Sequence, residues 1–387
     1  MPLSVCMSVG KDSGALPRAL ASVARIADEI ILVATTDDVS VENIATTFGA
    51  RVFNRPWADD FSAARNDAFA RATKDWIFWL DGDEWLDELS HREIRTCLAR
   101  EDTLAWLINI VDCSGPDGSP RFSSTPLPRL FRRLPDLRMV GRVHEHFEPG
   151  LNVIARQIGL EVRSSAINIF HDGYTADRES EKLRRNVRLI ELELRDRPGQ
   201  LFYQIRLSQA LLKLSDSRAY DFLRQAWEQI RPLAAETPGE PPPEPLIAEL
   251  LDSIIVRQSR GEFCSGWSLD TLHTLAAKWY PHWPPLLWRR ANWKFKQGRT
   301  AEAAQSLEEI LRLAANGTYQ RTPSFDSGIL SGETQLNLGI CYASLGRFDD
   351  ALRCFSSAAE SPAWAEAAKR NMQMISKRKW PHSPPSS

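Results

Sequence analysis

A buried apolar run that stops at a cluster of carboxylates is the feature that most constrains the fold of this chain. Residues 76–80 (Trp-Ile-Phe-Trp-Leu) are bulky and uninterrupted, which is typical of a strand covered on both faces of a sheet. Asp81, Gly82, Asp83 and Glu84 follow at once. They place negative charge at the carboxyl edge of the sheet, where open α/β sheets bind ligands. Two such oxygen ligands suit Mg²⁺ or Mn²⁺ bridging to a phosphate, whereas an acidic turn without a metal is the alternative interpretation.

The composition is that of an ordinary globular protein. Of 387 residues, 43% are apolar and 25% are charged, so two or three domains are expected. The net charge of −2 gives no sign of a nucleic-acid partner, and the six scattered cysteines favour neither a zinc site nor a disulfide framework. The first ten residues are too short and lack the basic residues of a signal peptide, and no apolar stretch is long enough to span a membrane. We therefore expect a cytoplasmic protein.

Strands and helices alternate through the first part of the chain. Apolar residues form short continuous runs in the expected strands and recur with helical spacing in the expected helices. This alternation predicts a doubly wound α/β domain built on a parallel sheet. The expected strands are residues 3–9, 29–33, 50–53, 104–111 and 167–174, and the expected helices are residues 16–26, 41–48 and a third that ends at residue 72.

A polar motif precedes the organising strand, in the helix that ends at residue 72. Asp60 or Ser62 is placed to cap that helix. Arg65 and Asn66 then lie about one turn in, where their donors are able to reach a diphosphate. A surface arginine paired with a neighbouring aspartate is the alternative, and it needs no ligand.

Histidine and carboxylate side chains recur later in the same domain. His144, Glu145 and His146 form a cluster that offers both a metal ligand and a general base. An ordinary polar surface loop is the alternative. His171 stands where the last expected strand ends.

Taken in this order, these pieces resemble the inverting glycosyltransferase family 2, and most closely its bacterial members with a C-terminal helical repeat tail. The resemblance covers roughly residues 3–175. No single piece is highly specific, but the ordered set is. The pieces are residues 6–9 with Asp12, residues 28–33, Trp57 with residues 60–62 and 65–66, residues 75–77 and 80–84, residues 129–132, residues 143–145, and His171 with residues 173–174.

The resemblance implies a GT-A fold, a nucleotide-sugar donor and a divalent cation, Mn²⁺ or Mg²⁺. Asp81 and Asp83 would hold the cation against the donor diphosphate and so neutralise the leaving nucleoside diphosphate. Glu145 is the expected base for a single in-line displacement, with His144 as a metal ligand or a supporting group. His171 is a further candidate metal ligand. The residues expected to contact the donor are Asp12, Arg65, Asn66, Asp81 and Asp37.

Two departures from the family pattern bear on donor recognition. Residues 11–13 read Lys-Asp-Ser where the family usually has Asn-Glu-Glu, although Asp12 remains able to accept a hydrogen bond from the ribose. Ala34 stands where the family usually has the aspartate that reads the nucleotide base. Either Asp37 or Asp38 swings in, or donor recognition has changed, or activity is lost. One lost hydrogen bond costs on the order of 1 kcal/mol, which weakens donor binding without abolishing it.

The second half of the chain has a different sequence pattern, with helical repeats in place of alternating strands and helices. Residues 338–358 match the tetratricopeptide pattern almost position by position, with weaker copies at residues 291–307 and 207–226. In such repeats small residues let paired helices touch, and large residues fill the gap to the next pair. The expected domains are residues 1–175, of α/β GT-A type with a doubly wound mixed sheet; residues 176–378, an all-α tetratricopeptide-like repeat domain with a Pro-rich loop at 232–245; and a flexible tail at 379–387.

Four tryptophans crowd one segment of the repeat domain, among several prolines. Packing between helix pairs is the expected role, and an aromatic surface for a sugar or a partner peptide is the alternative. The four are Trp279, Trp283, Trp288 and Trp293.

We therefore predict a metal-dependent inverting glycosyltransferase, of hexosyltransferase type, that moves a sugar from a nucleotide-sugar donor. The acceptor is a protein, peptide or glycan positioned by the repeat domain, which is also expected to bind a protein partner. The alternative is a non-catalytic interaction scaffold with a degenerate transferase domain, which Ala34 motivates. A nucleotidyltransferase is disfavoured, because the chain lacks a Gly-rich basic loop to cradle a triphosphate.

Overall fold

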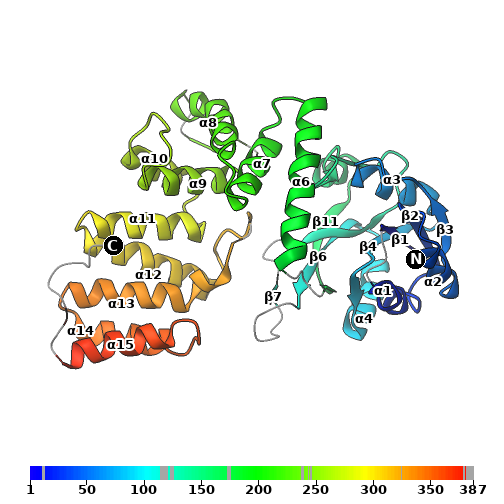
Figure 1. Cartoon of the computed structure of the whole chain (residues 1–387). Coiled ribbons are helices and arrows are strands. Elements are labelled where there is room, and N and C mark those ends of the chain that lie inside the picture. Colours follow the sequence, from blue (N-terminus) through cyan, green and yellow to red (C-terminus); the bar gives the residue numbers. More distant parts are fainter. Residues whose placement is uncertain are drawn as a thin grey trace. The chain divides into compact units, whose positions relative to one another are not determined.

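The computed structural model of the chain divides into two compact units (Figure 1). The first contains residues 1–203 and 210–215, and the second contains residues 204–209 and 216–387, so the division falls within helix α7 (Leu201–Lys213). The first unit includes α6 (Ala176–Asp196), which lies beyond the boundary at residue 175 that the sequence predicts. The structure describes residues 1–10, 14–113, 121–122, 126–171, 176–236, 239–242, 244, 246–323, 325–377 and 380.

In the described part of the first unit, nine strands form one mixed sheet. The strand order is β3 (Arg51–Asn54), β2 (Glu29–Ala34), β1 (Leu3–Val9), β4 (Trp76–Asp81), β8 (Leu127–Arg132), β6 (Thr103–Asp112), β11 (Glu161–His171) and β5 (Glu84–Leu86), with β7 (Arg121–Phe122) paired to β6. The first four strands run parallel, whereas β8 is antiparallel to both β4 and β6. A separate short pair joins β9 (Met139–Val140) to β10 (His146–Phe147).

Helices cover both faces of this sheet, which explains why its central strands are apolar without alternation. Residues 3, 5, 7 and 9 of β1 pack with α1 (Leu16–Val23), α2 (Val39–Thr47) and α4 (Glu88–Leu98) in one core cluster. Cys6 of the same strand belongs to the opposite cluster, with α3 (Phe61–Arg71) and α5 (Leu151–Ile158). The predicted α/β domain with a mixed sheet is confirmed.

Aspartate side chains cap the starts of two helices, and the sequence predicts the cap of one of them, α3. Asp60 caps α3, because its Oδ1 accepts a hydrogen bond from Ala63 N at 3.0 Å. Asp87 caps α4 in the same way through Ser90 N at 2.8 Å. The central strand β8 was not expected, because its residues mix arginines with apolar residues. Arg129 pairs with the buried Glu84, and Arg132 donates to the backbone carbonyls of Thr103 and Arg100.

The described part of the second unit contains helices and no β-strand (Figure 1). Gly339, within α13, faces α14 so closely that an added Cβ would lie 2.6 Å from the Phe355 ring. This small-against-large contact confirms the tetratricopeptide-like packing. No helix in the described residues is long and apolar enough to cross a membrane. The helices are α8 (Ala219–Glu236), α9 (Ile247–Ser259), α10 (Leu269–Trp279), α11 (Pro284–Lys296), α12 (Thr300–Asn316), a 3₁₀ turn η1 (Ser327–Leu330), α13 (Gly332–Ser344), α14 (Phe348–Ala358) and α15 (Ala365–Ser376).

One expectation for the second half differs from the structure in detail. Pro232 lies inside α8, which continues to residue 236, so the first residues of the expected Pro-rich loop are helical. The buried Trp227, Ile230 and Ala234 hold this helix, and their packing outweighs the hydrogen bond that proline removes. Trp279 and Trp283 are buried as the packing interpretation predicts.

Replacing Gly339 by alanine should destabilise the second unit by about 1–3 kcal/mol, because the added methyl group meets a fully buried ring. Helix propensity alone would favour alanine by about 1 kcal/mol, so a loss of stability identifies the contact as its cause. Gly239→Ala adds the same methyl group in open space and serves as the control. Thermal unfolding measures both variants, and equal melting temperatures would contradict this packing.

His273 makes the stability of the second unit depend on pH. Burial lowers its pKa from 6.5 to about 4, with further lowering by the charges of Arg290 and Lys294. The ring stacks on Trp293, and no hydrogen-bond partner for its nitrogens exists among the described residues. The folded protein therefore keeps His273 neutral, whereas the unfolded chain binds a proton below pH 6.5.

It follows that the free energy of unfolding should fall by about 3 kcal/mol as the pH drops from 6.5 to 4. His273→Phe keeps the stacking and should remove most of that fall. Denaturant titration at several pH values measures the effect, with His282→Phe, an exposed position, as the control. A variant with the same pH slope as the wild type would contradict the assignment.

Candidate active site

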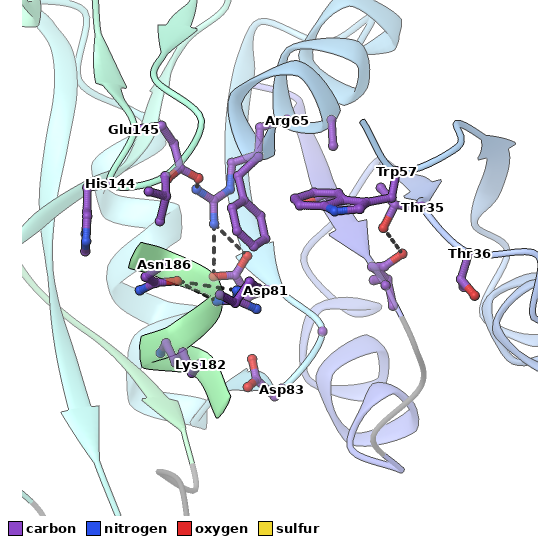
Figure 2. Close-up of a pocket in the computed structure, with 18 of the residues that line it drawn as sticks. Thr35, Thr36, Trp57, Arg65, Asp81, Asp83, His144, Glu145, Lys182 and Asn186 are labelled. Atoms are coloured by element: carbon purple, nitrogen blue, oxygen red, sulfur yellow. Dashed lines mark hydrogen bonds and ion pairs between the residues drawn. The ribbon is translucent and has the colours of Figure 1, made fainter. Parts of the chain in front are cut away.

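A cavity of about 740 Å³ opens at the carboxyl ends of the parallel strands in the first unit. The register of the sheet places Ser8 beside Asp81 and Val9 beside Ala34, so β1, β2 and β4 end at one edge. Three further segments complete the wall: the start of α3, the loop at residues 143–145, and α6 (Figure 2).

Asp81 and Asp83 both line this cavity, as the sequence predicts for the turn after β4. Glu84 closes that turn, because its Oε2 accepts a hydrogen bond from Asp81 N at 2.9 Å. Gly82 packs closely on β1, since a Cβ there would lie 3.2 Å from the side chain of Val9 and would have to displace it. The turn therefore presents two of its carboxylates to the cavity and uses the third to hold its own shape.

Arg65 lies between Asp81 and Glu145 and contacts both carboxylates (Figure 2). Its Nη2 contacts Asp81 Oδ1 at 3.0 Å, and its Nη1 forms an ion pair with Glu145. The guanidinium lies over the Trp79 ring, 4.0 Å from the ring centre. Burial acts to raise the pKa of Asp81, but the charges of Arg65 and Arg129 outweigh it, so the pKa lies below its usual value. Asp81 is therefore ionised at neutral pH.

A second ion pair lies beneath the cavity. Arg129 Nη2 and Nη1 contact the two carboxylate oxygens of Glu84 at 2.8 and 3.1 Å, and both side chains are almost fully buried. Arg129 also stacks 3.4 Å from the centre of the Trp79 ring and lies 3.7 Å from Asp81 Oδ2. Burial raises the pKa of Glu84 to about 7, and the charge of Arg129 opposes that rise. The Arg129–Glu84 pair therefore contacts Asp81 through both of its members and supports its position.

The loop that carries His144 and Glu145 is held in an uncommon backbone conformation. Gly141 has φ of 101° and His144 has φ of 55°, both in the left-handed region. Tyr203 Oη donates to Val143 O at 3.1 Å and lies 2.0 Å from where a Cβ of Gly141 would be, so only glycine fits there. This loop places His144 and Glu145 on the cavity wall.

The other predicted site residues lie elsewhere. Asn66 exchanges two hydrogen bonds with the backbone of Met139, at 2.7 and 2.9 Å, and does not line the cavity. Asp37 is exposed and also lies outside the lining, where Thr35 and Thr36 stand instead. His171 pairs across strands with Glu84 and is not a lining residue. Asp12 lies outside the described residues.

Three lining residues on α6 were not singled out from the sequence. Lys182, Arg185 and Asn186 are spaced so that they share one face of the helix. The same face continues to Leu189 and Glu193, which are buried. The available signal was one helix face with polar residues at its start and buried residues further along. The sequence alone does not show which part of the fold packs against that face.

The carboxylates present are suited to a hard divalent cation. No group of three or more His, Cys, Asp or Glu side chains able to hold a metal occurs among the described residues. Asp81 and Asp83 nevertheless share one cavity, and magnesium commonly takes one or two protein carboxylates together with substrate phosphates. The donor set therefore fits Mg²⁺ or Mn²⁺ bound jointly with a phosphate ligand.

Comparison with known proteins agrees with this geometry. Residues 4–150 match the family model described as Glycosyl transferase family 2. A TPR repeat-containing protein of Synechococcus elongatus is 34% identical over 238 residues, 59% of this chain and 57% of that protein. The SPbeta prophage-derived glycosyltransferase SunS of Bacillus subtilis is 28% identical over 229 residues, 56% of this chain and 51% of that protein. The chain thus spans about half the length of the curated relatives it matches.

Solved structures with a partial likeness fall into the same two groups. A TarS fragment of S. aureus in complex with UDP-GlcNAc has a TM-score of 0.40 at 13% identity, covering 71% of this chain and 90% of that chain. A thermophilic TPR protein of Thermus thermophilus has a TM-score of 0.31 at 19% identity, covering 51% of this chain and 93% of that chain.

The mixed sheet with its edge cavity has a GT-A-like architecture. The chain carries a glycosyltransferase family 2 domain at its N-terminus, followed by TPR-like helices.

Replacing Arg129 by methionine should destabilise the first unit by about 3–5 kcal/mol, because it leaves the Glu84 carboxylate buried without its partner. The double variant Arg129→Met/Glu84→Gln should regain a large part of that loss. Denaturant unfolding measures the three forms. Arg100→Met breaks an exposed pair with Asp102 and is the control, expected to match the wild type. If the single and double variants are equally destabilised, the ion pair is not the cause.

Proposed function

We propose that the first unit is a metal-dependent inverting glycosyltransferase that uses a nucleotide-sugar donor. One observation carries the proposal: Asp81, Asp83 and Glu145 face a single cavity within a family 2 domain. Two carboxylates for a cation and one for a base are the parts that such a displacement needs.

The chemistry follows from the placement of these side chains. Asp81 and Asp83 would hold Mg²⁺ or Mn²⁺, which when bound neutralises charge on the leaving diphosphate. Glu145 accepts the proton of the acceptor hydroxyl as that oxygen bonds to the anomeric carbon. The bond from that carbon to the diphosphate oxygen breaks on the opposite face, so the configuration inverts. Arg65 forms an ion pair with Glu145 and so holds the candidate base at the cavity.

Donor selection would rest on the edge of β2. Ala34 is 2% exposed and offers no polar group, whereas Thr35 and Thr36 reach the cavity. We expect their hydroxyl groups to contact the nucleotide in place of the usual aspartate. The same substitution favours the second candidate, a non-catalytic scaffold, if these contacts are too weak to hold a donor.

The acceptor is assigned to the second unit. A cavity of about 390 Å³ there is lined by Trp283, Trp288 and Phe325 together with carboxylates such as Asp326 and Glu333. Aromatic faces bind sugar rings and cationic side chains, and carboxylates attract the latter. This lining supports a protein, peptide or glycan acceptor. The same aromatic and acidic side chains would also suit the binding of a protein partner.

Asp83→Asn tests the proposal without knowledge of the acceptor. The full-length chain is incubated with Mn²⁺ and a panel of nucleotide sugars, and slow hydrolysis of the donor is measured. The wild type should turn over one donor, and the variant should lose at least about a hundredfold in rate, because a metal ligand is removed. Asp136→Asn, an exposed position outside the cavity, should match the wild type.

Unchanged turnover in Asp83→Asn would exclude the assigned metal site. Absence of turnover in the wild type, together with no binding of any nucleoside diphosphate by calorimetry, would overturn the enzyme assignment in favour of the scaffold.

A further inference from the structure

Helix α6 contributes a wall of the cavity from outside the residues that match the family model. That match ends at residue 150, and α6 spans Ala176–Asp196. Lys182, Arg185 and Asn186 all line the cavity from this helix. In Figure 2, Lys182 and Asn186 lie beside Asp81 and Asp83, on the side away from Trp57. The site is therefore completed by a segment that the family domain does not include.

The charges of the cavity lining would favour an anion once a cation is bound. Asp81, Asp83 and Glu145 carry the negative charges of the lining, and Arg65, Lys182 and Arg185 carry the positive ones. Arg65 already contacts two of those carboxylates. A divalent cation on the aspartates would give the wall a positive excess, and a diphosphate would balance it.

The two α6 cations sit in settings that suit a phosphate. Burial and the charge of Arg185 lower the pKa of Lys182, and the charges of Asp83 and Asp81 counteract this. The Arg185 guanidinium lies 4.9 Å from the centre of the Phe61 ring, another lining residue, and its Nη2 donates to Asn186 Oδ1 at 3.1 Å. One wall thus offers an ammonium and an oriented guanidinium, both of which bind phosphate oxygens.

The helix is fixed against the loop that carries Glu145. Glu193 Oε2 accepts a hydrogen bond from Arg142 N at 2.9 Å, and Asp196 pairs with the Arg142 side chain at 2.6 Å. Arg188 forms an ion pair with Asp59, and Leu189 is fully buried. Such anchoring holds the cations in place before the reaction, which is what stabilisation of developing charge requires.

We propose that Lys182 and Arg185 bind the diphosphate of the donor and stabilise the charge that appears on it as the sugar bond breaks. Cleavage leaves the bonding electrons on the diphosphate oxygen, so the leaving group gains one negative charge beside these side chains. The inference rests on the proposed function and extends it, because it makes α6 part of the catalytic unit.

Inorganic pyrophosphate is the probe, since it needs no knowledge of the nucleotide or sugar. Calorimetry with the full-length chain and Mg²⁺ compares the wild type with Lys182→Met, Arg185→Met and Lys182→Arg. Each methionine variant should weaken pyrophosphate binding by about tenfold or more, and Lys182→Arg should retain most of it. Arg184→Met removes the same charge from an exposed position of α6 and should bind like the wild type.

Titration with Mn²⁺ alone separates this role from simple neutralisation of the aspartates. If Lys182 and Arg185 only neutralise Asp81 and Asp83, their removal should tighten Mn²⁺ binding and leave the affinity for pyrophosphate unchanged. That result overturns the proposal. So does wild-type affinity for pyrophosphate in both methionine variants, or no pyrophosphate binding by the wild type. Thermal unfolding confirms that each variant is folded.

Turnover of the donor distinguishes failure of the inference from failure of the proposed function. If the wild type hydrolyses a donor and Lys182→Met keeps its turnover number, the role of α6 in the reaction is refuted while the enzyme assignment stands. If pyrophosphate binding depends on Lys182 but no donor is hydrolysed, the anion site stands and the transferase assignment fails.

Discussion

The site depends on one buried guanidinium. Arg65 contacts Asp81 and Glu145 together and lies on the face of Trp79, so a single side chain links the turn at residues 81–84 to the loop that carries Glu145. Burying charge is costly unless it is paired, and here Arg65 and Arg129 form ion pairs with three carboxylates and lie on the Trp79 ring. Within this network the charges of Arg65 and Arg129 hold the pKa of Asp81 below its usual value, so Asp81 stays ionised at the end of a buried strand.

The remaining parts of the first unit support that network from different points of the sequence. The cap of α3 sets the start of the helix that carries Arg65, and β8 brings Arg129 beneath Asp81. The backbone of residues 141–147 bends through the left-handed region and is held there by Tyr203 and Glu193. Segments within the family match and beyond its C-terminal end therefore cooperate to place one carboxylate, Glu145, at the cavity.

The two units solve the problem of packing in different ways. In the first, a sheet is covered on both faces, and its polar groups gather where the parallel strands end. In the second, helices approach one another through small residues, as at Gly339 against Phe355, and leave a cavity with an aromatic and acidic lining. The first arrangement gathers polar side chains at one edge of a sheet, and the second leaves aromatic and acidic side chains around a cavity between helices.

The sequence by itself determined the alternation of strands and helices, the apolar strand with its terminal aspartates, a helix cap at Asp60 or Ser62 and the repeat pattern around Gly339. Each of these follows from local periodicity or from a side chain acting on its neighbours. Tertiary structure alone decided that β8 enters the sheet, that Asn66 serves the backbone of Met139, that Asp37 stays outside the cavity and that Lys182 enters it. Those outcomes depend on partners far away in the chain. The sequence alone does not show whether a polar side chain faces solvent, forms an ion pair or lines a cavity.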